Sequence, residues 1–361
     1  MESAPEKPEI EEGWREFAPY LKELARGPES LADLDPRRCR EAMEMILAGV
    51  ASPAQAASFL MVGRAKGNSA SELAATSRAM RSFVRGIEPG DGPPVVTVTG
   101  GFDGKLRTAN IGAAASLVAA AAGARVLILG SENVPPKEGA TSLTALRIMG
   151  AGSPQTLEQA RDSLSLHGFA ATSLAHYLPE LHDLLQLRRE MARRTALNVS
   201  EKLISPMAGS AMMVGMTHRK PFLETMPRAL VELGVRRALV FQAIEGSDEA
   251  PLDGASALVT IRDGEVRETA VRPETLGMAK VSRSELPAPD SGGAHSVREA
   301  LEGARGPLRD LILYNAALRL WMSEGSEDPL EESLAAPLER SRLALDEGRA
   351  SSLLEQLRPA L

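Results

Sequence analysis

Short apolar runs alternate with helix-like segments after about residue 94, and this alternation limits the fold more than any other feature of the sequence. The runs are VVTVT, RVLILG, MMVGM and ALVFQ, and each is bounded by glycine or charged residues. Strands that are apolar on both faces and separated by helices are typical of a sheet covered by helices on both sides. We therefore expect an α/β region with a central, mostly parallel sheet. The Asp-Gly turn in ALVTIRDGEVRETAV predicts a strand hairpin over residues 254–275.

The first part of the chain has a different pattern, because every segment before the linker at Pro89–Pro94 is helix-like. Start signals recur there, namely Asp35-Pro, Ser52-Pro and the capping box from Ser69 to Glu72. We expect a small N-terminal helical domain beside the larger α/β domain. The predicted division is a disordered lead over 1–12, a helical domain over 13–88 joined by helices from 155–200, an α/β domain over 89–361, and a flexible loop over 290–294.

Composition excludes several classes of protein. The chain has 361 residues, of which 43% are hydrophobic, so it can bury a large core. Its net charge of −7 argues against a domain that mainly coats nucleic acid. The single cysteine, Cys39, excludes an internal disulfide and a cysteine metal cage. The acidic N-terminus is unlike a secretory signal, and no apolar run reaches the length of a membrane span. We expect a soluble, cytoplasmic protein with no membrane partner.

The segment Thr97–Gly104, TVTGGFDG, lies between an expected strand and an expected helix over Asn110–Ala122. Gly100 and Gly101 let an anion approach the main chain closely, at the positive end of that helix. Asp103 offers a carboxylate for a magnesium ion that bridges phosphates. The segment therefore predicts a phosphate site, and the alternative is a tight turn without a ligand.

Three further clusters of polar residues follow expected strands or helices. GSENVPPKEGAT carries Lys137, a cation able to reach phosphate, and Glu245–Glu249, EGSDE, is a candidate magnesium site. The basic helix Arg188–Arg194 leads to Thr195 and Asn198, where an arginine can grip a carboxylate. The alternative for EGSDE is a solvated acidic turn, and the alternative for the basic helix is a charged helix face. A lone histidine such as His176 is usually a surface or core residue.

Together these motifs resemble the glycosyltransferase family 3 group, which contains anthranilate phosphoribosyltransferase and its divergent bacterial paralogues. VTGGFDGKLRTANIGA is similar to the family's glycine segment, Arg194-Thr195-x-x-Asn198 to its acceptor motif, and Asp248-Glu249 to its metal-binding pair. The resemblance runs from about residue 20 to the end of the chain. It implies that phosphoribosyl pyrophosphate is bound by Thr99, Gly100, Gly101, Asp103, Asn110, Lys137 and Gly139, the acceptor by His176, Arg194 and Asn198, and the metal by Asp248 and Glu249.

The resemblance also implies a fold and an activity. The fold is a helical domain joined to an α/β domain like those of nucleoside phosphorylases and phosphoribosyltransferases. The implied reaction transfers a phosphoribosyl group from phosphoribosyl pyrophosphate to an anthranilate-like aromatic amine, with Mg²⁺ as cofactor and no side chain assigned as a nucleophile. The family forms dimers through its helical domain, so a homodimer is expected.

The chain departs from the family pattern at four positions that the family uses near phosphate and metal. Val98 replaces a glycine, Gly112-Ala113 replaces Ser-Thr, and Glu132 replaces an arginine. These departures leave two alternatives open. One is a transferase for a nucleobase or another aromatic acceptor. The other is a non-enzymatic paralogue that binds nucleic acid through a basic strip formed by Arg188, Arg189, Arg193, Arg194, Arg219 and Lys220.

Overall fold

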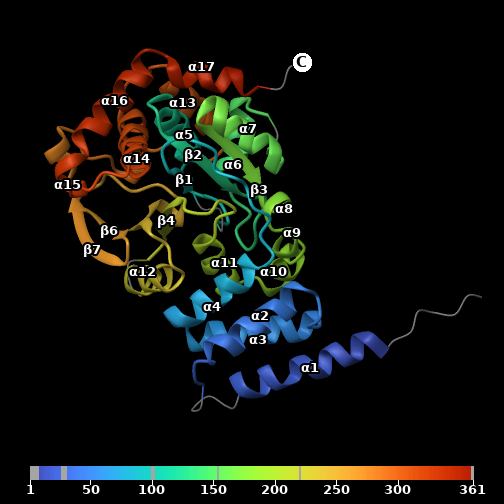
Figure 1. Cartoon of the computed structure of the whole chain (residues 1–361). Coiled ribbons are helices and arrows are strands. Elements are labelled where there is room, and N and C mark those ends of the chain that lie inside the picture. Colours follow the sequence, from blue (N-terminus) through green and yellow to red (C-terminus); the bar gives the residue numbers. More distant parts are fainter. Residues whose placement is uncertain (1–7, 26–30, 99–101, 153, 219–220, 359–361) are drawn as a thin grey trace, which may run out of the picture.

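The computed structural model describes residues 8–25, 31–98, 102–152, 154–218 and 221–358. A small helical group, coloured blue, lies at one end of the molecule, and a larger α/β region built on one sheet lies at the other (Figure 1). Thr99, Gly100 and Gly101 of the glycine segment lie outside the described residues, as do Arg219 and Lys220. No described helix has the length and apolar character needed to cross a membrane.

The helical group begins with four helices that pack around Phe17, Met43 and Phe59. The expected capping boxes at Ser52 and Ser69 are both formed. The first helix begins at Pro8, within the range 1–12 that was expected to be a disordered lead. The helices are α1 (Pro8–Leu24), α2 (Pro36–Leu47), α3 (Pro53–Lys66) and α4 (Ala70–Arg81).

Residues 155–200 contribute short helices to the same cluster, but they also contain a strand that the sequence analysis missed. Leu174, Tyr177 and Leu181 are buried in the cluster that holds Phe17. The missed strand is short and contains two alanines, so it lacks the apolar run that marked the others. The elements are α7 (Leu157–His167), β3 (Phe169–Ser173), α8 (Leu174–Tyr177), α9 (Pro179–His182), α10 (Leu185–Met191), α11 (Ala196–Ser200) and the 3-10 turn η2 (Glu201–Leu203).

The sheet has seven strands in the order β3-β2-β1-β4-β5-β6-β7. The first five in this order are parallel and the last two antiparallel, so the expected mostly parallel sheet is confirmed. The predicted hairpin is confirmed as well, and its turn has positive φ at Asp263 and Gly264. The remaining strands are β1 (Val95–Val98), β2 (Arg125–Gly130), β4 (Ala211–Met216), β5 (Arg237–Gln242), β6 (Ser256–Arg262) and β7 (Glu265–Val271).

Helices cover both faces of the sheet, and small residues let two of them approach closely. The helix rich in alanine, α5, packs against the long helix α14, and nearly all of its residues are buried. The loop expected over 290–294 is wrong, because the Asp290 side chain accepts a hydrogen bond from the Gly293 amide and starts a helix there. The helices are α5 (Gly112–Ala121), α6 (Ser142–Met149), α12 (Phe222–Glu232), α13 (Ser291–Leu301), α14 (Pro307–Glu324), α15 (Leu330–Ser333), α16 (Ala335–Asp346) and α17 (Arg349–Gln356).

The parallel strands all have their carboxyl ends on the same side of the sheet, which we call its carboxyl edge. Open α/β sheets bind ligands there. Strand β1 leads there into the glycine segment, β4 into Thr217, and β5 into the 3-10 turn η3 (Ile244–Gly246). The helical group faces this edge, with α4 and α11 between the two regions (Figure 1). The fold thus brings four of the polar clusters found in the sequence to one place.

Gly104 is a position where the backbone tolerates only glycine. Its φ is +87°, and a Cβ built there would lie 2.1 Å from the carbonyl carbon of Gly139. Gly104→Ala is therefore expected to lower the free energy of unfolding by about 3 kcal/mol, from the left-handed conformation and overpacking together. Gly49→Ala is the matched control, because Gly49 has a φ of +73° but nothing within 4 Å. Urea denaturation should show a loss of only about 1 kcal/mol for the control, and equal losses would contradict the close approach.

Candidate functional site

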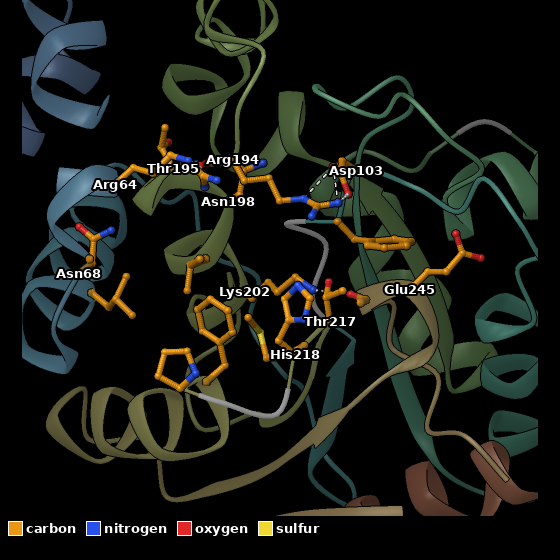
Figure 2. Close-up of a pocket in the computed structure, with 18 residues that line it drawn as sticks. Arg64, Asn68, Asp103, Arg194, Thr195, Asn198, Lys202, Thr217, His218 and Glu245 are labelled. Carbon is orange, nitrogen blue, oxygen red and sulfur yellow. Dashed lines mark hydrogen bonds and ion pairs between the residues drawn. The ribbon is translucent and has the colours of Figure 1, made fainter. Parts of the chain in front are cut away.

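A pocket of about 340 Å³ lies between the helical group and the carboxyl edge of the sheet. Its volume is within the range of small-molecule sites. Figure 2 shows side chains entering it from both sides, with Arg64 and Asn68 from the helical group and Asp103 and Glu245 from the sheet edge. Its other polar lining residues are Arg194, Thr195, Asn198, Lys202, Thr217 and His218, and Phe102, Leu73 and Phe222 are among its apolar walls.

Asp103 and Arg194 meet across the pocket, as the dashed lines in Figure 2 show. The Arg194 guanidinium donates two hydrogen bonds of 2.9 Å, one to each carboxylate oxygen of Asp103. The Lys137 ammonium lies 3.4 Å from the same carboxylate. The structure therefore brings together three residues that the sequence analysis assigned separately to donor and acceptor binding. It also shows a partner for Arg194 within the protein itself.

Backbone hydrogen bonds fix Lys137 beside the glycine segment. The Gly139 amide donates to the Asp103 carbonyl at 2.9 Å, and Lys105 and Ala140 exchange two further bonds of 2.9 Å. The Lys137 ammonium lies 5.0 Å from the centre of the Phe102 ring, a cation–π distance. Two loops that are distant in the sequence thus form one rigid wall, and Asp103, Lys137 and Gly139 lie within it.

Lys202 is a pocket residue that the sequence analysis did not identify. Its ammonium donates to the carbonyls of Gly215 at 2.7 Å and Gly246 at 2.6 Å, and only 6% of the residue is exposed. Burial lowers the pKa of Lys202 from 10.5 to about 8. No local motif marks this lysine, since its partners come from β4 and η3. At neutral pH it supplies the pocket with a positive charge.

This pKa predicts how stability depends on pH. Below pH 8 Lys202 is charged in both folded and unfolded chains, so folding carries the full cost of burying the charge. Between about pH 8 and 10.5 the folded protein releases the proton while the unfolded chain keeps it, and the cost disappears. Relative to Lys202→Met, the wild-type free energy of unfolding should rise by about 3 kcal/mol over this range. Urea denaturation of both proteins at pH 7.5 and 10.5 measures this difference, and parallel curves would contradict the buried charge.

At the start of helix α5, two backbone amides already have a partner within the chain, whereas Gly100 and Gly101, where we expected phosphate to bind, lie outside the described residues. The Ile111 and Gly112 amides donate to one Glu249 carboxylate oxygen at 2.8 and 3.0 Å. The Gly112 amide also donates to the Asn110 side-chain oxygen at 3.1 Å, within a local turn before the helix. The anion at the positive end of the helix is therefore the chain's own carboxylate.

The predicted metal pair, Asp248 and Glu249, is buried and already neutralised. The Lys105 ammonium bonds to Glu249, and both side chains are fully buried. The Arg319 guanidinium bonds to Asp248. Among the described residues, no group of three or more acidic, histidine or cysteine side chains is arranged to hold a metal ion. In this structure each of the two carboxylates therefore has a cation of the protein itself as its partner, and the metal assignment made from sequence stays a prediction.

His176 is not among the residues that line the pocket, and its predicted role with an acceptor stays a prediction. Its Nδ1 atom lies 2.8 Å from the Gln155 carbonyl oxygen, and the residue is not part of the pocket lining. Asn198 does line the pocket, where its side-chain oxygen accepts from the Thr195 amide at 3.1 Å. The histidine at the pocket is His218, which directly follows β4 and Thr217.

The basic strip considered for nucleic acid is not formed by the described residues. Arg188 is buried and pairs with Glu201 at 3.1 Å. Arg189 pairs with Glu138 at 2.5 Å, and Arg194 faces Asp103. Arg193 remains exposed. The arginines that are adjacent in the sequence thus point to different partners, and Arg219 and Lys220 lie outside the described residues.

Comparison with known proteins gives a consistent result over most of the chain. Residues 18–84 match the glycosyl transferase family helical bundle domain, and residues 95–351 match the glycosyl transferase family a/b domain. The chain is 33% identical over 335 residues to anthranilate phosphoribosyltransferase of Thermomicrobium roseum, covering 90% of this chain and 92% of that protein. It is 30% identical over 338 residues to the Thioalkalivibrio sulfidiphilus enzyme of the same name, covering 93% and 97%.

Solved structures agree with these relatives. The crystal structure of anthranilate phosphoribosyltransferase from Thermus thermophilus has a TM-score of 0.80 and 28% identity, covering 94% of this chain and 98% of that one. The Saccharomyces cerevisiae enzyme in complex with phosphoribosyl pyrophosphate and Mg has a TM-score of 0.78 at 17% identity, covering 94% and 96%, and this likeness supports the fold alone. The chain belongs to the glycosyl transferase family 3, as a member similar to the anthranilate phosphoribosyltransferases.

Proposed function

We propose that this chain transfers a phosphoribosyl group from phosphoribosyl pyrophosphate to a small aromatic amine that carries a carboxylate. The observation that carries the proposal is the pocket itself. Asp103 and Lys137 of the donor-side segments and Arg194 and Asn198 of the acceptor motif meet there within hydrogen-bond distance or share its lining. Family membership supports the same reaction class.

The pocket's cations are suited to an anionic donor. Arg194, Lys202 and Arg64 line the pocket and Lys137 lies beside Asp103, whereas Asp103 and Glu245 are the carboxylates of the lining. In the proposed reaction the acceptor nitrogen attacks the anomeric carbon, and the bond to the pyrophosphate oxygen breaks with its electron pair staying on that oxygen. The proton that the nitrogen loses passes to the leaving pyrophosphate or to water. Lysine and arginine charges then stabilise the leaving pyrophosphate, and the enzyme contributes mainly by positioning and by charge.

Arg194 is the proposed contact for the acceptor carboxylate. The Arg194 guanidinium already binds the Asp103 carboxylate through two hydrogen bonds. A ligand carboxylate can accept the same pair of bonds. Binding of the acceptor then requires Arg194 to exchange Asp103 for the ligand. Phe102 and Phe222 offer apolar surface for an aromatic ring. An anthranilate-like acid matches this combination better than an uncharged nucleobase.

The first test is calorimetry with phosphoribosyl pyrophosphate, followed by chromatographic detection of product with a panel of acceptors. The panel contains anthranilate, its positional isomers and the free nucleobases. We expect one donor site per chain and product formed from an aminobenzoate. Absence of donor binding at millimolar concentration would overturn the proposal. Product from a nucleobase alone would show that the acceptor is a nucleobase and not an aminobenzoate.

A second candidate function is binding of an aromatic acid without transfer. It is favoured by the Glu249 carboxylate on the α5 amides, which occupies a position suited to a phosphate. In that case calorimetry would detect anthranilate-like acids but not phosphoribosyl pyrophosphate. The same two titrations therefore separate the candidates.

Two further expectations stay predictions for this chain. A homodimer through the helical group is inherited from the family resemblance. A cytoplasmic location is supported by the single cysteine, Cys39, which is buried and free. Sedimentation and cell fractionation measure them directly.

A further inference from the structure

We propose that Lys105 and Arg319 take the place of a divalent cation at the Asp248–Glu249 pair. The chain then binds its phosphorylated donor without metal, a consequence that rests on the proposed function. The first part of the proposal concerns only the four side chains. Two adjacent carboxylates repel each other unless a cation lies between or beside them. Here the cations beside them are two side chains of the protein, Lys105 and Arg319.

Lys105 fills the position beside Glu249 completely. Its ammonium bonds to the carboxylate oxygen Oε2 and donates to the Ala109 carbonyl at 2.7 Å. The other oxygen of Glu249 accepts from the Ile111 and Gly112 amides, so both oxygens of the carboxylate have partners. Since Lys105 and Glu249 are each 0% exposed, water has no access to this carboxylate. A metal ion would need at least one of these oxygens.

Arg319 bonds to one carboxylate oxygen of Asp248, whose side chain is 7% exposed. It reaches the carboxylate from the middle of α14, and its other donors are satisfied by the Ser116 hydroxyl and the Asn315 carbonyl, each at 3.0 Å. These bonds hold the guanidinium in one orientation. Removing it from Asp248 would leave a buried arginine without a charge partner, which is costly.

Gly112 supplies an independent observation at the same place. A Cβ built on Gly112 would lie 2.6 and 2.8 Å from the two Asp248 carboxylate oxygens. The absence of a side chain at 112 is therefore what admits Asp248 to its position beside Arg319. The family's Ser-Thr pair at 112–113, which the resemblance connects with phosphate and magnesium, is absent from this chain. The position without a hydroxyl thus lies beside the carboxylate that Arg319 pairs with.

Titration of the purified full-length protein with Mn²⁺, followed by electron paramagnetic resonance of the free ion, tests the first part without any ligand. We expect no site tighter than about 1 mM in the wild type, and the same result for Glu249→Gln. The control for surface carboxylates is Glu332→Gln, which alters an exposed glutamate. Stoichiometric Mn²⁺ binding by the wild type that Glu249→Gln abolishes and Glu332→Gln preserves would overturn the proposal. Even if a variant does not fold, the wild-type titration still tests whether the protein binds Mn²⁺ tightly.

Calorimetry with phosphoribosyl pyrophosphate, in EDTA and in 5 mM MgCl₂, tests the second part. We expect dissociation constants within about twofold of each other. A loss of tenfold or more in EDTA would overturn metal-independent binding. If the donor does not bind in either buffer, the proposed function fails, while the Mn²⁺ titration still decides whether the carboxylate pair takes a metal.

Discussion

Glu249→Gln is expected to lower the free energy of unfolding by about 3–5 kcal/mol, the usual cost of removing one partner from a buried ion pair. Glutamine keeps the shape and one acceptor oxygen, so the Ile111 and Gly112 amides retain a partner. The loss therefore comes from Lys105, whose charge stays buried without a counterion. Urea denaturation followed by circular dichroism measures the change.

Two controls separate this charge effect from a general effect of substitution. Glu332→Gln removes an exposed glutamate and should change stability by less than about 0.5 kcal/mol. The double variant Lys105→Met with Glu249→Gln removes both charges, and it should be more stable than Glu249→Gln alone by at least about 1 kcal/mol. Additive losses in the double variant would show that the two side chains do not form a coupled pair.

The second large effect is expected at Arg194, and it concerns ligand affinity rather than stability. Arg194→Ala should weaken binding of the aromatic acid about a hundredfold, which corresponds to about 2.8 kcal/mol. A charge-assisted hydrogen bond contributes about 1.5–3 kcal/mol, and the fork can make two of them. Calorimetry with the acid that gives product in the wild type is the measurement.

Neighbouring substitutions give this prediction its controls. Arg193→Ala removes an exposed arginine that is adjacent in sequence, and it should leave affinity within about twofold. Arg194→Lys keeps the charge but cannot form the fork, so only part of the affinity should return. Equal losses for Arg193→Ala and Arg194→Ala would indicate that general positive charge, not this fork, attracts the acid.

Much of the fold followed from local pattern. The runs VVTVT, RVLILG, MMVGM and ALVFQ are apolar enough to mark buried strands, and the Asp-Gly hairpin turn is specific. β3 was missed because its sequence, FAATS, is short and contains small residues. The start of α13 was missed because Gly292 and Gly293 suggest a loop, whereas capping by Asp290 overrides them.

The site was less predictable, because its decisive contacts join residues far apart in the sequence. Asp103, Lys137 and Arg194 were each recognisable from a motif, but only the fold shows that they meet. Lys105 and Glu249 are separated by 144 positions, and no spacing rule connects them. His176 was chosen by its place in a family pattern, and its Nδ1 atom lies 2.8 Å from a backbone carbonyl oxygen, that of Gln155.

A crystal structure of the protein soaked with phosphoribosyl pyrophosphate and MgCl₂ shows which cations face Asp248 and Glu249 when the donor is bound. We expect phosphate density in the pocket beside Arg194, Lys202 and Lys137, with Lys105 still on Glu249 and Arg319 still on Asp248. A metal ion bridging Asp248 and Glu249, with Lys105 displaced, would contradict this expectation.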